Sequence, residues 1–169
     1  MVILISGTTH TGKTVLSQRL MEEYKIAYFS IDHLKMGLIR SGETSLTVND
    51  DKALTPYLWS IVKEMIKTAI ENKQNIIIEG CYIPFDWQKD FEESYLPEIK
   101  FYCLIMTAEY IENNFSKILK YESVIENRIT TDVNKEDLIS DNKQNLQLCK
   151  EYGLKYILVD KNYEINIKL

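Results

Sequence analysis

Short apolar runs separated by longer amphipathic stretches recur along the whole chain. The runs that are rich in β-branched and aromatic residues have the length of strands, and they lie at residues 2–6, 26–31, 75–80, 100–106 and 155–159. The run at 75–80 is apolar on both sides of the pleat, as expected of a central strand in a parallel sheet. The pattern therefore predicts five mostly buried strands.

The stretches between these runs carry apolar residues at helical spacing. The clearest begins at Thr55-Pro56, where Thr55 is placed to cap a helix and Pro56 takes the first helical position without losing a hydrogen bond. Further helices are predicted after the first strand and at residues 33–40, 109–127 and 135–151. Asn134 is placed to cap the last of these helices, and Gly153 is placed to end it.

Strands that alternate with helices in this way predict an α/β fold with a parallel sheet, helices on both faces and right-handed crossovers. The chain has 169 residues and no internal repeat or linker, so we expect a single domain over residues 1–169. A charged segment at about 113–137 has two interpretations. It is either a small helical lid over a site or an ordinary pair of solvated helices.

A phosphate-binding motif stands between the first predicted strand and the first predicted helix. It consists of Gly7, Thr8, Thr9, His10, Thr11, Gly12, Lys13 and Thr14. In this Walker A pattern, glycines let the backbone curl round an anion, and the dipole of the following helix also favours negative charge. We expect Lys13 to bind the β- and γ-phosphates, Thr14 to bind Mg²⁺ and His10 to line the loop. The alternative, a plain turn, is disfavoured by the strand before the motif and the helix after it.

Acidic residues follow two other predicted strands. Asp32 comes directly after the second strand, and the pair Glu79-Gly80 ends the third. Because ligands of parallel sheets bind at the carboxyl ends of the strands, we expect both acids to lie beside the phosphate loop.

The composition of the chain indicates which classes of partner it can bind. A formal net charge of -5 leaves no general basic footprint, which disfavours nucleic acid and favours a small molecule. No segment approaches the roughly 20 apolar residues of a membrane span, and the first apolar run is too short for a signal peptide. The three cysteines are far apart and are expected to be reduced thiols. We therefore expect a cytoplasmic monomer or homodimer.

The order of these motifs resembles the adenylate kinase-like P-loop kinases. The Asn-Lys-x-Asp motif of GTPases is missing, and the chain is too short for the machinery of helicase-like motors. A phosphate loop, then Ile31-Asp32-His33-Leu34-Lys35, then Ile78-Glu79-Gly80 and a helical segment before the last strand are similar to gluconate kinase, chloramphenicol phosphotransferase, 2-phosphoglycerate kinase and the zeta-type toxins. The resemblance covers nearly the whole chain in layout, although only the phosphate loop is specific. It implies a three-layer P-loop fold that transfers the γ-phosphate of ATP, with Mg²⁺, to a small-molecule hydroxyl or phosphate.

The resemblance also implies roles for the two acids. Asp32 is the candidate base that takes the proton from the acceptor hydroxyl. Its alternative role is to cap the helix at 33–40. Glu79 looks like the Walker B acid that positions Mg²⁺, or alternatively like a hydrogen-bond anchor for the phosphate loop, and Gly80 accompanies it on the acceptor side.

Cationic residues are the candidates for binding phosphoryl groups and the acceptor. Arg128, in the predicted lid, is the candidate for stabilising charge on the transferred phosphoryl group. Lys35 and Arg40 are candidates for acceptor binding, while Arg19 is expected to face solvent. Two alternatives to a kinase of neutral metabolites stay open, namely a nucleoside or nucleotide kinase and a non-catalytic nucleotide-binding switch. A group of aromatic residues either lines the acceptor site or packs in the core: Tyr57, Trp59, Tyr82, Phe85 and Trp87.

Overall fold

A parallel β-sheet forms the centre of the protein. The computed structural model describes residues 1–121 and 133–168. In that part of the chain the sheet has five strands, which are β1 (Val2–Gly7), β2 (Ala27–Ser30), β3 (Ile76–Glu79), β4 (Ile99–Met106) and β5 (Tyr156–Val159). Their order across the sheet is β2-β3-β1-β4-β5, and every pairing is parallel. The predicted α/β class and its parallel sheet are confirmed.

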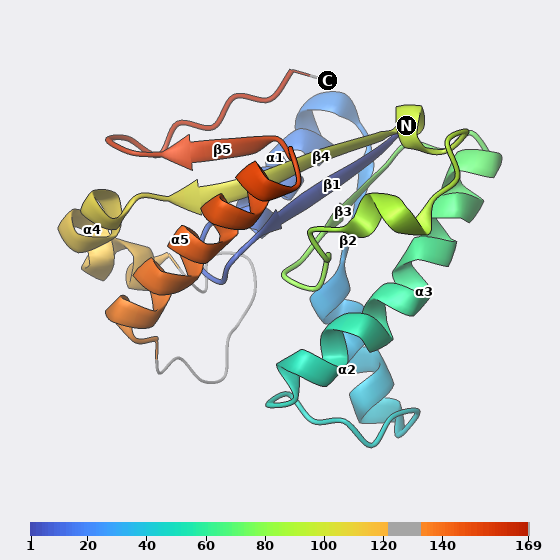
Figure 1. The fold of residues 1–169 in the computed structure, drawn as a ribbon, viewed down its shortest axis with the longest axis horizontal. Helices are drawn as coiled ribbons and strands as arrows, with labels where there is room; N and C mark the ends of the chain where they lie inside the picture. Colours follow the sequence, from blue (N-terminus) through green and yellow to red (C-terminus); the bar gives the residue numbers. More distant parts are fainter. Residues whose placement is uncertain (122–132, 169) are drawn as a thin grey trace.

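Helices cover both faces of this sheet. They are α1 (Lys13–Tyr24), α2 (Ile31–Ser41), α3 (Asp51–Glu71), α4 (Ala108–Lys120) and α5 (Lys135–Glu151). Two short 3₁₀ turns, η1 (Trp87–Asp90) and η2 (Leu96–Glu98), precede β4. Figure 1 shows α4 beside the carboxyl ends of β4 and β5, α5 alongside β4, and α2 and α3 on the opposite side of the molecule. Residues of α3 pack against one face of the sheet, and residues of α1 and α4 pack against the other, so the arrangement is three-layered.

The alternation of side chains along β1 divides the core in two. Val2 and Leu4 pack into a cluster with residues of α3, whereas Ile3 and Ile5 pack into a second cluster with residues of α1, α4 and the C-terminal segment. All four side chains are completely buried. Because successive residues of a strand point to opposite faces, β1 anchors both layers, and the phosphate loop starts from its rigid end.

The start of α3 differs from the sequence prediction. The helix begins at Asp51 rather than at Thr55, and Pro56 lies inside it. The backbone N–H of Leu54 donates to the carbonyl of Asp50 at 2.8 Å, and the Leu54 side chain is completely buried. Pro56 is the sixth residue of the helix and removes the hydrogen bond to the carbonyl of Lys52, and burial of Leu54 offsets this cost.

The boundaries of α5 agree with the sequence prediction. The Asn134 side chain accepts hydrogen bonds from the backbone N–H groups of Glu136 at 2.8 Å and Asp137 at 3.4 Å. At the other end Gly153 has a φ of 63°, and the N–H of Leu154 donates to the carbonyl of Cys149 at 2.8 Å. This pattern is a Schellman motif, which explains why the helix ends at a glycine.

The middle of the predicted lid, residues 122–132, falls outside the described residues. The preceding helix was expected to reach residue 127, but α4 ends at Lys120, and the structure describes nothing from 122 to 132. Whether the segment at 113–137 forms a lid therefore stays a prediction. Among the helices that the structure describes, none has the length and hydropathy needed to cross a membrane.

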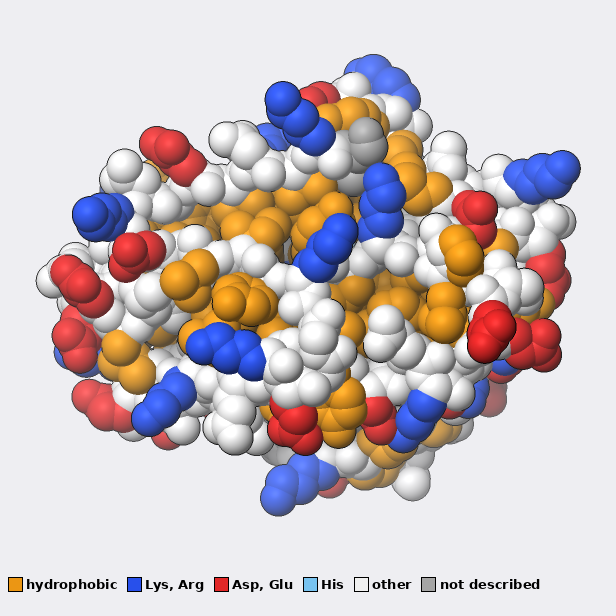
Figure 2. Space-filling view, turned by 45° about the horizontal axis from the view of Figure 1, so that its top comes forward, with side chains coloured by type: hydrophobic (Ala, Val, Ile, Leu, Met, Phe, Trp, Pro, Cys, Tyr) orange, Lys and Arg blue, Asp and Glu red, His pale blue; other side chains and the backbone are white. Residues whose placement is uncertain are grey.

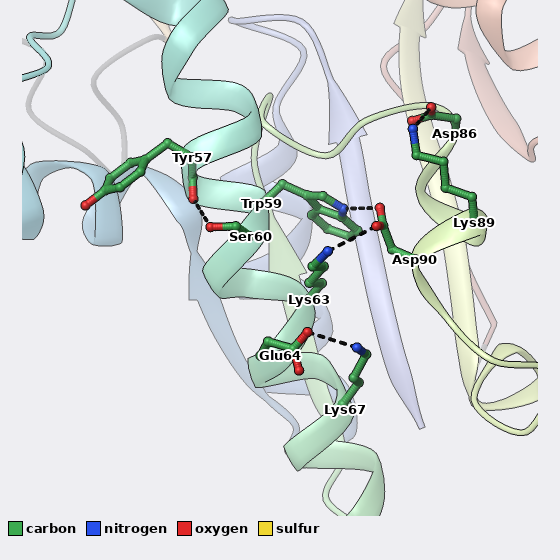
Figure 3. Close-up of polar contacts among 9 residues, drawn as sticks. All are labelled: Tyr57, Trp59, Ser60, Lys63, Glu64, Lys67, Asp86, Lys89 and Asp90. Atoms are coloured by element: carbon green, nitrogen blue, oxygen red, sulfur yellow. Dashed lines mark hydrogen bonds and ion pairs between the residues drawn. The ribbon is translucent and has the colours of Figure 1, made fainter.

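The segment between β3 and β4 is fixed to α3 by polar and aromatic contacts. Trp59 donates through Nε1 to Asp90 Oδ2 at 2.8 Å, and Lys63 Nζ lies 3.1 Å from Asp90 Oδ1 (Figure 3). Behind these contacts the Trp87 and Phe101 rings stack with centroids 6.0 Å apart. Both tryptophans of the aromatic group singled out in the sequence therefore pack in the core.

Candidate active site

The phosphate loop adopts backbone angles that require glycine at its two ends. Gly7 has a φ of 141°, and a Cβ there would lie 2.6 Å from the backbone oxygen of Leu104. Gly12 has a φ of 82°, and a Cβ there would lie 1.8 Å from Tyr163 Oη. The backbone of β4 thus packs against the start of the loop at Gly7, and the C-terminal segment packs against its end at Gly12.

Hydrogen bonds within the loop hold it at the start of α1. Thr11 Oγ1 and Lys13 Nζ both donate to the carbonyl oxygen of Thr8, each at 2.8 Å. The N–H of Leu16 donates to the carbonyl of Gly12 at 2.9 Å and so begins the helix. The first N–H groups of a helix have no partner within the helix, and its dipole is positive at this end. This arrangement can bind an anion such as a phosphate group.

Lys13 is a buried cation surrounded by negative groups. Lys13 is only 6% exposed. Burial alone would lower the pKa of Lys13, but the Cys81 side chain and the Glu79 and Asp32 carboxylates outweigh burial and raise that pKa. The ammonium therefore stays charged at neutral pH. Both acids predicted from the strand ends act on this one lysine.

Glu79 lies beside the first turn of α1. It is 1% exposed, and it accepts a hydrogen bond from Thr14 Oγ1 at 3.3 Å through Oε1. The pairing of β3 with β1 places Glu79 opposite Ile5, two residues before the phosphate loop. Gly80 continues this edge, because its N–H donates to the carbonyl of Ile5 at 3.1 Å and a Cβ on it would lie 2.9 Å from that of Ile31.

Asp32 is the second residue of α2, and its position excludes one of its two predicted roles. The N-cap position of α2 is held by Ser30, so the interpretation of Asp32 as the helix N-cap is wrong. The helix starts at Ile31, two residues earlier than expected, and the Ile31 side chain is completely buried. Packing of this side chain in the core explains the earlier start. Asp32 Oδ1 accepts a hydrogen bond from Lys35 Nζ at 2.5 Å. A carboxylate in a first turn also interacts favourably with the helix dipole.

The predicted cationic residues lie in different places. Lys35 contacts Asp32, whereas Arg40 is exposed at the far end of α2, about 12 Å from Asp32 along the helix axis at 1.5 Å per residue. Arg19 is exposed, as expected, and its guanidinium donates to the carbonyl oxygen of Ile165. Arg128 lies outside the described residues, so its role stays a prediction.

Two tyrosines at this site were not identified as polar contacts from the sequence. Tyr163 donates through its hydroxyl to the carbonyl oxygen of Thr11 at 2.8 Å, and Tyr82 bonds to both Lys35 and Asp51. Tyr163 is 152 residues from its partner, and Tyr82 is 31 residues from Asp51. No local sequence pattern links residues so far apart. The only signal for Tyr82 is its place in the aromatic group that was a candidate for lining the acceptor site.

Comparison with known proteins finds likeness in structure but not in sequence. No protein family matches the sequence, and no curated protein does either. A proposed kinase from Chloroflexus aurantiacus has a TM-score of 0.57 and 16% identity over 96% of this chain and 88% of that one. Shikimate kinase from Bacteroides thetaiotaomicron has a TM-score of 0.53 and 14% identity over 95% and 85%. The chain has the P-loop kinase fold. At these identities the likeness extends to the fold and no further.

On the P-loop kinase fold, the residues at this edge fit ATP and Mg²⁺. The anion-binding loop and the charged Lys13 suit a triphosphate, and the oxygen atoms of Thr14 and Glu79 suit a hard cation. Within the described residues there is no cluster of three or more His, Cys, Asp or Glu side chains that could hold a metal. Mg²⁺ is usually bound through one or two protein groups together with the substrate phosphates.

Positive and negative side chains are mixed on one face of the molecule. Figure 2 shows lysine and arginine side chains interspersed with aspartate and glutamate over one face of the molecule.

Proposed function

We propose that the protein is a phosphotransferase that moves the γ-phosphate of ATP to a hydroxyl group of a small molecule. The observation that carries this proposal is the convergence of both strand-end acids on one lysine of the phosphate loop. Asp32 follows β2 and Glu79 ends β3, and the pairings of Ser30 with Glu79 and of Glu79 with Ile5 bring the ends of both strands to the edge where the phosphate loop starts. Both carboxylates also raise the pKa of Lys13. A second carboxylate at this edge supports transfer to an acceptor hydroxyl in addition to nucleotide binding.

Each of these groups has a role in the proposed reaction. Lys13 binds the β- and γ-phosphates, and Thr14 with Glu79 holds Mg²⁺. When bound, ATP supplies the phosphoryl group, and Mg²⁺ neutralises part of the charge on its phosphates. Asp32 accepts the proton of the acceptor hydroxyl as that oxygen attacks the γ-phosphorus, and the bond from the γ-phosphorus to the β–γ bridging oxygen breaks, so ADP leaves. Such a positioned base is worth about 10² to 10⁴ in rate.

Binding of ATP to the protein is the first test of this proposal. We expect calorimetric titration to show binding that is stronger with Mg²⁺ than without it and is largely lost in Lys13→Ala, because the buried ammonium is the main positive charge facing the phosphates. Lys67→Ala is a suitable control, since Lys67 pairs with Glu64 on α3. Absence of binding, or equal binding by Lys13→Ala, would contradict the proposal.

A panel of small-molecule acceptors then separates a kinase from a nucleotide-binding switch. A kinase forms a phosphorylated product that mass spectrometry detects in the presence of ATP and Mg²⁺. A switch binds ATP and protects the segment near residues 113–137 from exchange, but it transfers phosphate to no acceptor.

A further inference from the structure

Four polar side chains form a connected network on the side of the phosphate loop where Asp32 lies. Asp32 and Lys35 come from α2, Tyr82 follows β3, and Asp51 is in the first turn of α3. Lys35 Nζ donates to Asp32 Oδ1 at 2.5 Å and to Tyr82 Oη at 3.0 Å. Tyr82 Oη in turn donates to Asp51 Oδ1 at 2.9 Å. Three elements thus hold the ammonium of Lys35 in one place.

The positive charge of Lys35 is already engaged within this network. Its side chain is only 14% exposed, and Nζ lies 5.0 Å from the centroid of the Tyr82 ring, which adds a cation–π interaction. An ammonium has three N–H donors, and two of them are used by Asp32 and Tyr82. Lys35 is therefore a fixed ion partner of Asp32, with its charge matched by that carboxylate and one N–H donor left over.

The network as a whole offers negative charge to a bound molecule. Its two carboxylates and one ammonium sum to a net charge of -1, because Tyr82 remains neutral. The neighbouring Lys13 and Glu79 add one charge of each sign, so they leave this sum unchanged. Burial and the hydrogen bond to Asp51 raise the pKa of Tyr82, which keeps its proton at neutral pH. The unused lone pairs belong to carboxylates, so they accept hydrogen bonds from hydroxyl groups. A phosphate or carboxylate group in the same position would meet like charge.

We propose that Lys35 is a positioning residue for Asp32 and that the acceptor is an uncharged hydroxyl compound, such as a sugar or polyol. This inference rests on the proposed kinase function and adds the charge class of its acceptor. It assigns Lys35 a different role from the acceptor-binding role expected from the sequence. It also disfavours a nucleoside monophosphate as the acceptor bound through Lys35.

Matched pairs of acceptors test the charge class directly. Sorbitol against gluconate and glucose against glucose 6-phosphate differ mainly in one anionic group. With ATP and Mg²⁺, we expect kcat/KM for the reactive uncharged member to exceed that of its anionic partner by at least about tenfold, because of like-charge repulsion. A preference for the anionic member that disappears in Lys35→Met would overturn the inference and leave the kinase function intact.

The role of Lys35 is tested by separating kcat from KM. Loss of the ion partner leaves Asp32 less well placed, so Lys35→Met should lower kcat by about tenfold or more with little change in the KM of the acceptor. Lys35→Arg, which keeps the charge, should recover part of the loss. Lys67→Met is a matched control, because Lys67 and Glu64 form an ion pair of the same i,i+3 spacing on α3. A raised KM at unchanged kcat in Lys35→Met would show that Lys35 binds the acceptor instead.

A binding experiment tests the inference even if none of these acceptors reacts. The protein is first loaded with a non-hydrolysable ATP analogue and Mg²⁺, and failure to load would contradict the proposed function itself. Glucose 6-phosphate is then titrated into the loaded wild type and Lys35→Met. We expect no difference between the two proteins. Millimolar or tighter binding that Lys35→Met abolishes would overturn the inference alone.

Discussion

At the scale of single residues, Gly12 shows how the C-terminal segment constrains the phosphate loop. Its positive φ alone disfavours any other residue, and Tyr163 occupies the space that a Cβ would need. Tyr163 also bonds to the carbonyl of Thr11, the residue before Gly12. A side chain at position 12 would therefore displace the tyrosine and remove that hydrogen bond.

We expect Gly12→Ala to destabilise the protein more than Gly42→Ala does. Gly42 has a similar φ of 78°, but a Cβ there would meet nothing within 4 Å. Gly42→Ala should cost about 1–2 kcal/mol in backbone strain, and Gly12→Ala should cost more and also weaken ATP binding. Urea unfolding and ATP titration measure both effects. Equal losses of stability and unchanged ATP binding would show that the contact with Tyr163 is unimportant.

At the scale of elements, the ends of α5 were predictable and the start of α3 was not. Asn134 and Gly153 act through hydrogen bonds to their own neighbours, so the local sequence contains the whole signal. Thr55-Pro56 is an equally clear local signal for a helix start, but α3 begins five residues earlier. Burial of Leu54 decided that boundary, and burial depends on the rest of the fold.

The cap of α5 gives a prediction at this scale. Asn134→Ala removes the acceptor for two backbone N–H groups and should lower the free energy of unfolding by about 0.5–2 kcal/mol. Asn134→Asp keeps an acceptor oxygen and should retain most of that stability. Urea unfolding of the two variants checks this expectation. Equal stability of Asn134→Ala and wild type would mean that the start of α5 contributes nothing to folding.

At the scale of the whole molecule, the positions of the two acids relative to the phosphate loop could be predicted from the sequence, because all strands of a parallel sheet run in the same direction. A parallel sheet brings the carboxyl ends of its strands to one edge, so Asp32 and Glu79 could be placed near Lys13 before any contact was known. The partners of these residues could not be predicted in the same way. Tyr82, Asp51 and Tyr163 reach the site through long-range packing, for which the sequence has no periodic signal.

The proposed kinase function requires that the site formed by the phosphate loop, Asp32 and Glu79 transfers the γ-phosphate of ATP and does not only bind ATP. Asp32 is the residue on which this claim depends, because its N-cap role is excluded and its carboxylate adjoins the phosphate loop. Replacement by asparagine keeps the size of the side chain and removes the proton acceptor. Glu64→Gln is a matched control, because Glu64 also pairs with a lysine three residues away.

The most direct test is the rate of γ-phosphate transfer from ATP to the reactive acceptor by Asp32→Asn and by wild type. We expect Asp32→Asn to fold, to bind ATP with nearly unchanged affinity and to transfer phosphate about 10² to 10⁴ times more slowly. Glu64→Gln should transfer phosphate at the wild-type rate. Transfer by folded Asp32→Asn at close to the wild-type rate would contradict the proposed mechanism.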